Sequence, residues 1–149
     1  MSSTYSFKDT TGAFTHPLVG AFSFSGQIGF GQFTIAMAVE QTVHDIAADG
    51  NVMISAVAGD PGSISVEVQQ TSALHSFLLA WYNAIKVLRD AGDVTNWAAA
   101  SLTLRNLVDG STHVATGIAP TKIPDKVYAA QGQRLTWVLL CADIQNLTL

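Results

Sequence analysis

Residues 72–91, SALHSFLLAWYNAIKVLRDA, form the stretch around which the rest of this chain is organised, because no other segment has a sustained helical repeat. Large apolar residues recur there at the i, i+3, i+4 and i+7 spacing that gives a helix one apolar face. They are Leu74, Phe77, Leu78, Trp81, Ile85 and Leu88. His75, Lys86 and Arg89 fall on the polar side. Thr71 or Ser72 is suited to the N-cap, and Gly92 is suited to ending the helix in a left-handed conformation.

The sequence on both sides of this helix is typical of β-strands. Apolar and small polar residues alternate over 32–41 and 63–69, the repeat of a strand with one buried face. An Asp-Gly pair at 49–50 predicts a hairpin turn, and turn residues also occupy 9–12 and 59–62. Further strands are expected at 5–8, 13–16, 52–57, 97–106, 113–119 and 134–143. We therefore predict a mainly β fold of two packed antiparallel sheets, a sandwich or open barrel, with one flanking helix at 72–91.

The length of 149 residues suits a single domain, here expected to span 1–149. Within it, residues 1–31 are predicted to be an extended N-terminal arm that ends in a Gly-rich loop. The glycines of GAFSFSGQIGFG (20–31) lack the dinucleotide-binding order and the strand-then-helix context that this motif requires.

Composition indicates a protein that assembles. Apolar residues make up 48% of the chain and charged residues only 12%, against about 25% charged in an ordinary soluble domain. So few charges leave a monomer little to cover its surface, which predicts that part of it is buried in an assembly. Up to Glu67 the only basic residue is Lys8, whereas bases slightly outnumber acids afterwards. An acidic half and a basic half suit head-to-tail stacking, and solvated faces explain the same pattern.

Patterns for catalysis or cofactor binding are missing. The histidines, His16, His44, His75 and His113, have no metal-ligand spacing, and no serine stands in a G-x-S-x-G elbow. Cys141 alternates with apolar residues, as a core residue would, and Glu40 and Glu67 lack the aromatic neighbours of a sugar site. We expect no enzyme, no metal and no cofactor. No apolar run approaches the roughly 18 residues of a membrane span, so no membrane insertion is expected.

Three stretches in this order resemble the tail tube proteins of contractile-tailed bacteriophages. They are YSFKDTTGAFTHP (5–17), GQIGFGQFTIAMAVEQTVHDIAADGNVMIS (26–55) and GDPGSISVEVQQTS (59–72), the last leading into the helix. The resemblance implies hexameric rings that stack into a hollow tube inside a sheath, with the inner sheets of the subunits joined into one β-barrel around a DNA channel. It implies as partners other copies of the chain, the tail sheath, baseplate and tail terminator proteins, a tape measure protein in the lumen, and transiently passing DNA. The location implied is the virion tail, assembled in the cytoplasm of the bacterial host.

The strand faces and loops have expected places in such a tube. Small, neutral or acidic side chains would suit a channel wall, because they would not hold DNA phosphates. The residues expected to face the lumen are Thr34, Ala36, Ala38, Glu40, Ser63, Ser65, Glu67 and Gln69. Strand addition between rings is expected from residues 1–16 of the N-terminal arm and from a hairpin loop at 42–60. The expected inter-subunit residues are Tyr5, Phe7, Phe14, His44, Asp45, Asp49 and Val52. Lys86 and Arg89 are expected to face the sheath. For each of these faces, simple exposure to solvent is the alternative.

Two other functions remain open at this point. The tube of a phage-tail-like bacteriocin or secretion system would stack in the same way without a genome to pass. A stand-alone β-sandwich binding module would instead need an exposed aromatic patch. The positions of Trp81, Trp97 and Trp137 are more typical of a core.

Overall fold

The computed structural model of the chain describes residues 4, 6, 9–25, 30–108 and 110–148, without the side chains of Ser25 and Phe30. This part contains nine strands and one helix. In chain order they are β1 (Thr10–His16), β2 (Gly20–Ser25), β3 (Phe30–Met37), β4 (Thr42–Ile46), β5 (Val52–Ala56), β6 (Gly62–Gln69), α1 (Ala73–Asp90), β7 (Ala100–Asn106), β8 (Ser111–Pro120) and β9 (Arg134–Thr148).

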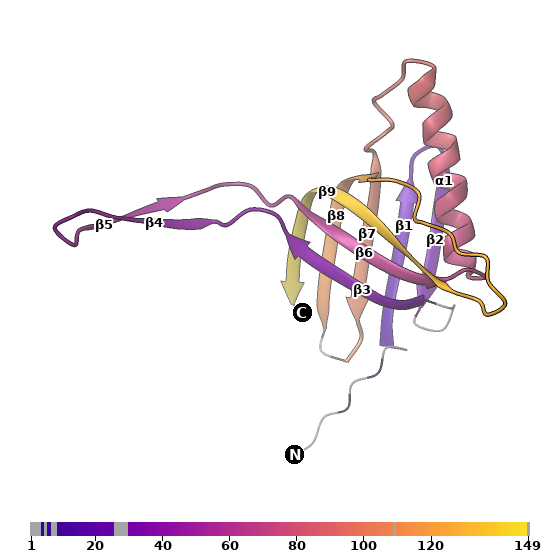
Figure 1. The fold of residues 1–149 in the computed structure, drawn as a ribbon, viewed down its shortest axis with the longest axis horizontal. Helices are drawn as coiled ribbons and strands as arrows, with labels where there is room; N and C mark the ends of the chain where they lie inside the picture. The colour runs from indigo at the N-terminus through magenta and orange to yellow at the C-terminus, as the bar shows by residue number, and fades with distance from the viewer. Residues whose placement is uncertain (1–3, 5, 7–8, 26–29, 109, 149) are drawn as a thin grey trace.

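Seven of the strands form one antiparallel sheet in the order β2-β1-β7-β8-β9-β6-β3. The sheet curls, so that β3, β6 and β9 cross in front of β1, β7 and β8 (Figure 1). The two terminal strands meet across the core, where the ring of Phe24 on β2 stacks on that of Phe33 on β3 with centroids 5.4 Å apart. The predicted mainly β fold with one helix is confirmed. Its two packed layers are the two halves of a single curled sheet.

Helix α1 packs its apolar stripe against the inside of this sheet. Trp81 and Ile85 are fully buried, and the Trp81 ring meets Phe14 of β1 edge-on at 4.9 Å. The helix begins as expected, since the Ser72 hydroxyl accepts a hydrogen bond from the Leu74 backbone N–H at 3.2 Å. It ends at Gly92, whose φ of +92° is the left-handed conformation that glycine adopts without strain.

His75 departs from the sequence-based expectation, because it lies on the buried side of α1. It is 7% exposed, and its Nδ1 accepts a hydrogen bond from the indole N–H of Trp137 on β9 at 3.1 Å. Trp137 is itself fully buried, so its N–H needs an acceptor inside the protein. Burial, and secondarily the charge of Lys126, lowers the pKa of His75. A neutral ring is therefore the stable form here.

The predicted N-terminal arm is wrong for residues 10–25, which form β1 and β2 within the main sheet. The expected turn at 9–12 lies largely in β1. Gly12 is needed there as a strand residue, because a Cβ at this position would lie 2.6 Å from the Phe24 ring. The strand expected at 13–16 is confirmed as the second half of β1. A strand at 20–25 was not expected, although Phe22 and Phe24 alternate there with Ala21 and Ser23. The expected strand at 5–8 and the Gly-rich segment at 26–29 fall outside or largely outside the described residues.

Other boundaries shift by a few residues. The strand expected at 32–41 ends at Met37, and that expected at 97–106 begins at Ala100. The last strand, expected at 134–143, continues to Thr148, because the tail pairs along β8. β9 thereby pairs with β6 along its first part and with β8 along its second part, and so connects the two halves of the sheet.

Candidate functional site

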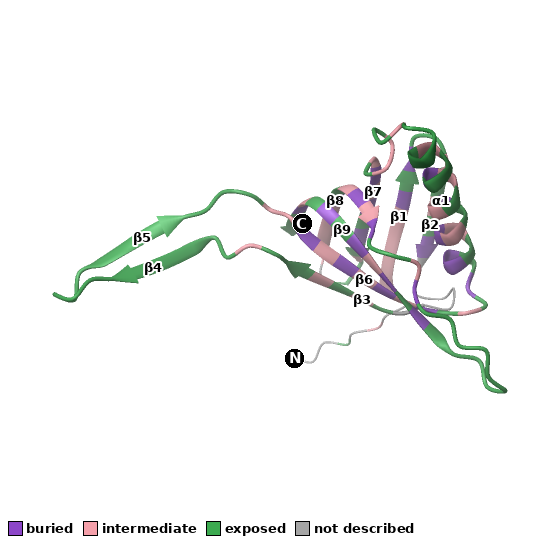
Figure 2. Ribbon diagram, turned by 45° about the horizontal axis from the view of Figure 1, so that its top comes forward, coloured by how far each residue is buried: buried purple, intermediate pink, exposed green. Residues whose placement is uncertain are grey.

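A two-stranded hairpin, β4–β5, projects far from the curled sheet (Figure 1). Its pairing runs from Thr42 opposite Ala56 to Ile46 opposite Val52. The predicted Asp-Gly turn closes it: Gly50 has a φ of +88°, and the Asp49 carboxylate accepts a hydrogen bond from the Asn51 backbone N–H at 3.0 Å. Every residue of both strands is exposed, as the uniform colour of the hairpin in Figure 2 shows.

The exposed hairpin is rich in apolar side chains. Ile46 is 70% exposed and Ile54 66% exposed, and both lie on one face with Val52, because directly paired and alternate residues of a hairpin share a face. Val43 and Met53 are exposed on the other face. An isolated hairpin is marginally stable in water, and clustered exposed apolar residues mark interaction sites. This element is therefore suited to being covered by another protein surface.

The root of the hairpin is tied firmly to the sheet. The Gln41 side chain donates a hydrogen bond to the Asp60 carboxylate at 2.7 Å, and the Gln41 carbonyl accepts one from the Val57 N–H at 2.9 Å. The Asp60 carbonyl in turn accepts a hydrogen bond from the Ile144 N–H of β9 at 2.9 Å. These contacts set the direction in which the hairpin leaves the body.

The outer face of β3 and β6 brings together most of the residues expected to line a channel. Thr34 lies opposite Ser65 and Ala36 opposite Ser63 in the pairing register, and all four are exposed or half-buried. Glu67 and Gln69 continue the row along β6. Ala38 and Glu40 lie beyond the end of β3, near the hairpin root, and so are not part of this sheet face.

A cation that the sequence analysis did not include completes this face. Arg134, at the start of β9, lies opposite Gln69 in register. Its guanidinium forms an ion pair with the Glu67 carboxylate and donates a hydrogen bond to it at 3.0 Å. The pairing neutralises the acidic row, so the face is small and nearly neutral rather than acidic. The sequence positions of the two residues are 67 apart. No local pattern indicates that they meet.

The two terminal strands, β2 and β3, each have one edge with no strand beside it among the described residues. Such edges present backbone N–H and C=O groups that template pairing with another chain. In a symmetric assembly, closure of the sheet across subunits would remove this liability.

The residues expected at subunit contacts divide into three groups. His44, Asp45, Asp49 and Val52 lie exposed on the hairpin or its turn. Tyr5 and Phe7 lie outside the described residues. Phe14 is a correction: it is 1% exposed within the core of its own chain, so it is not available to bind another copy. It points inward because β1 belongs to the sheet and the side chains of a strand alternate between its faces.

The polar face of α1 carries Lys86 and Arg89, both exposed. The Arg89 guanidinium stacks over the Trp97 ring at 4.9 Å and pairs with Asp90 at 3.2 Å, so it is partly engaged within its own chain. Trp81 and Trp137 are fully buried and Trp97 is half-buried. The three tryptophans therefore do not form an exposed aromatic patch.

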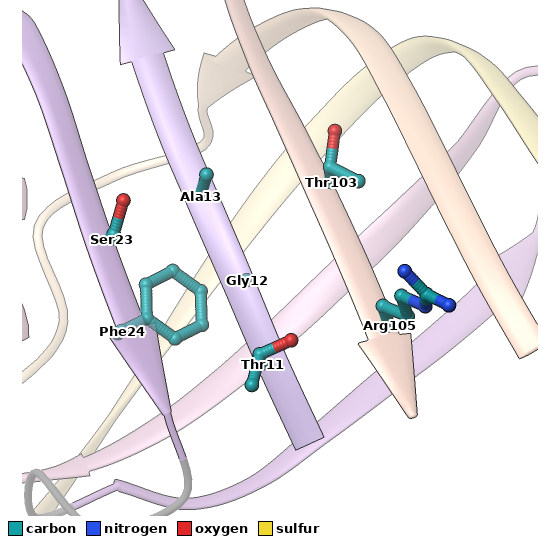
Figure 3. A pocket seen from close by; sticks show the side chains of 7 residues that line it. All are labelled: Thr11, Gly12, Ala13, Ser23, Phe24, Thr103 and Arg105. Carbon is teal, nitrogen blue, oxygen red and sulfur yellow. The ribbon is translucent and has the colours of Figure 1, made fainter. Parts of the chain in front are cut away.

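The described residues do not assemble a catalytic or metal centre. Within them, no three His, Cys, Asp or Glu side chains are grouped to hold a metal ion. Cys141 is buried, and burial raises the pKa of its thiol to about 11. A hollow of about 530 Å³ lies over β2, β1 and β7, but Arg105 is the only charged residue among those that line it (Figure 3). The described part of the chain also lacks a helix with the length and apolar character needed to cross a membrane.

Comparison with known proteins is consistent with an assembly role. Residues 1–148 match the profile of the family described as "Bacteriophage PhiTE tail tube protein". None of the curated proteins has a matching sequence.

Several solved structures share the fold. A chain of the anti-feeding prophage baseplate aligns with a TM-score of 0.63 and 18% identity, over 99% of this chain and 98% of that one. A chain of the sheath–tube complex of an extracellular contractile injection system, PVC, in its extended state aligns at 0.61 and 10% identity, over 95% and 90%. A chain of the PVC sheath/tube terminator aligns at 0.62 and 11%, over 99% of both chains.

Proposed function

The chain belongs to the bacteriophage PhiTE tail tube protein family, and on that premise we propose that it forms hexameric rings that stack into a hollow tube. It is a structural protein rather than an enzyme, found in the tail tube of a phage or phage-like particle. In the proposed assembly a contractile sheath surrounds the tube, and the tube conducts phage DNA.

The observation that carries the proposal is the β4–β5 hairpin, 42–56, which is exposed along its whole length in the single subunit. A segment with several uncovered apolar side chains is suited to burial against neighbouring copies. Its fixed root would aim it at a neighbour in the adjacent ring. The free edges of β2 and β3 would support sheet closure between subunits in one ring.

The proposed channel wall is the outer face of β3 and β6, with Thr34, Ala36, Ser63, Ser65, Glu67 and Gln69. Its side chains are small, and Arg134 already neutralises Glu67. DNA binding strengthens with the number of phosphates that cations contact, so this wall would let DNA slide. Ala38 and Glu40, next to the hairpin root, would lie at the rim of the ring.

The remaining proposed partners follow from the assembly. The sheath would contact Lys86 and Arg89 on α1, while the baseplate and tail terminator would cap the tube ends and a tape measure protein would occupy the lumen. The similar chains from sheath–tube, terminator and baseplate structures share the fold and support this list. The tube of a phage-tail-like bacteriocin or secretion device is the alternative, which neighbouring genes would distinguish.

Electron microscopy with negative stain over a range of protein concentrations tests the proposal. Rings or hollow tubes with a central pore are expected. The matched control replaces residues 43–55 by Gly-Asn, which closes Thr42 onto Ala56 as a two-residue turn. This variant should melt like the wild type and stay monomeric. A wild-type protein that is monomeric at every concentration and does not extend on a baseplate would refute the tube.

The channel wall has its own test in assembled tubes. A cysteine at Ser63 should react with a small maleimide but not with a maleimide on a polymer too large to enter the pore. Equal reaction with both reagents would place this face outside the lumen.

A further inference from the structure

The two ends of the subunit's long axis differ in charge. At one end is the hairpin with its root, residues 38–60, which contains four carboxylates, Glu40, Asp45, Asp49 and Asp60, and no Lys or Arg. At the other end is the loop between β8 and β9, residues 121–133, as both ribbon views show (Figures 1 and 2). This loop contains two basic residues, Lys122 and Lys126, and one acid, Asp125, whereas Arg134, which follows it, is already paired with Glu67 at 3.0 Å.

The loop also exposes apolar surface. Tyr128 is 87% exposed and Val127 is 52% exposed. Lys122 makes only a long, fully solvated contact with Asp125 at 4.0 Å, an ion pair weak enough to exchange for another partner. Apolar and basic groups on one loop complement the apolar and acidic groups of the hairpin.

Gln70 holds this loop in place. Its side-chain amide donates a hydrogen bond to the Val127 carbonyl at 2.7 Å and accepts one from the Gln133 N–H at 3.3 Å. Beside this clamp is a hollow of about 310 Å³, whose lining includes Gly132 and Arg134. A preorganised surface with a hollow favours docking, because little ordering is left to be done on binding.

We propose that the loop 121–133 of one copy is the docking surface for the β4–β5 hairpin of a second copy, with the hairpin turn entering the hollow beside Gly132 and the acidic strand residue Asp45 facing Lys126. The contact joins opposite ends of identical chains and is therefore heterologous, the kind of contact that propagates along a filament. This inference rests on the proposed tube and specifies which surface of the adjacent ring receives the hairpin.

A second copy fits both surfaces better than DNA or the sheath. The acidic hairpin would repel the phosphates of DNA. In a homopolymer every copy supplies one hairpin and one loop, so the two surfaces are present in equal numbers. Binding of the sheath protein to the basic loop is the competing outcome.

Disulfide trapping between two single-cysteine variants tests the contact directly. Asn51→Cys, at the hairpin turn, and Tyr128→Cys, in the loop, are mixed, co-assembled into tubes and oxidised. The expected result is a covalent dimer that needs both variants. Thr103→Cys replaces Tyr128→Cys as the matched control, because Thr103 is exposed on the opposite half of the sheet, and it should give no dimer. The buried native Cys141 is common to all samples.

Charge exchange gives an independent readout. Asp45→Lys and Lys126→Glu should each raise the critical concentration for tube formation on the order of tenfold, and the double variant should restore it toward the wild-type value. Arg105→Glu, the same change of charge outside the contact, should leave that concentration unchanged. Melting temperatures of all variants establish that each subunit is folded.

The outcomes separate the two proposals. Tubes that form without the Asn51–Tyr128 disulfide and without rescue by charge exchange refute this contact and leave the tube intact. In tubes assembled with their sheath, crosslinking of Tyr128→Cys to the sheath protein instead of to the hairpin also refutes it. A wild-type protein that never assembles refutes the tube itself.

Discussion

Replacing the exposed isoleucines of the hairpin, Ile46→Thr with Ile54→Thr, should uncouple assembly from folding. The two side chains are 70% and 66% exposed in the single subunit. Complete burial of an isoleucine side chain contributes about 2 kcal/mol, so covering the exposed two thirds in a tube would contribute roughly 1.4 kcal/mol for each. Threonine retains the β-branched shape that favours a strand.

Because threonine keeps one methyl group, the double variant should weaken each subunit contact by slightly less than the sum of the two contributions, about 2.5 kcal/mol. The critical concentration for tube formation should rise on the order of 100-fold. Its free energy of unfolding should change by less than about 0.5 kcal/mol, because little of either side chain is buried within the subunit. Sedimentation of tubes over a concentration series measures the first quantity, and denaturant unfolding of the monomer measures the second.

Val94→Thr is the matched control, since Val94 is 66% exposed but lies in the loop after α1. It should alter neither quantity. Assembly of the double variant at the wild-type concentration would refute burial of the hairpin in the tube. A fall of several kcal/mol in the free energy of unfolding would show instead that the isoleucines stabilise the subunit.

Three further predictions concern the subunit itself. The lowered pKa of His75 means that the unfolded chain binds a proton more readily, so the stability of the native subunit should decline as pH falls below about 6.5. His75→Gln keeps an acceptor for Trp137 and should reduce that decline in denaturant titrations at pH 7 and pH 5. An unchanged loss of unfolding free energy between the two pH values would contradict this role. Gly62→Ala should lower the free energy of unfolding by about 1–3 kcal/mol, because the added Cβ would collide with the Ala36 carbonyl oxygen; an unaltered melting temperature would show that β3 moves freely. The Cys141 thiol, with a pKa of about 11, should be alkylated at pH 8 about a hundredfold more slowly in the native subunit than in the unfolded chain, as mass spectrometry would reveal, and equal rates would argue against its burial.

Much of the fold can be predicted from local patterns. The helical repeat at 72–91 predicts α1 within a residue or two, because the spacing of apolar residues directly records which side of a helix is buried. The alternation over 63–69 predicts β6 in the same way. The Asp-Gly pair at 49–50 predicts the hairpin turn, since its glycine must adopt a positive φ.

Less of the candidate site can be predicted from local sequence patterns. The hairpin at 42–60 can be predicted, but its complete exposure cannot, because apolar β-branched residues such as Ile46 and Ile54 normally indicate burial. Phe14 was expected at a subunit contact because the strand predicted at 13–16 was assigned to an arm outside the sheet, whereas it pairs with β7 inside it.

By itself the sequence determined the periodic elements, the hairpin turn and the low content of charged residues. Each of these depends only on neighbouring residues or on totals. Only the tertiary structure decided that β1 and β2 join the sheet, that Arg134 neutralises Glu67 and that the basic loop lies at the end opposite the hairpin. These features depend on antiparallel pairings between distant parts of the chain and on the curl of one sheet. Neither leaves a local pattern, because a strand's repeat shows which face is buried but not which strand will lie beside it.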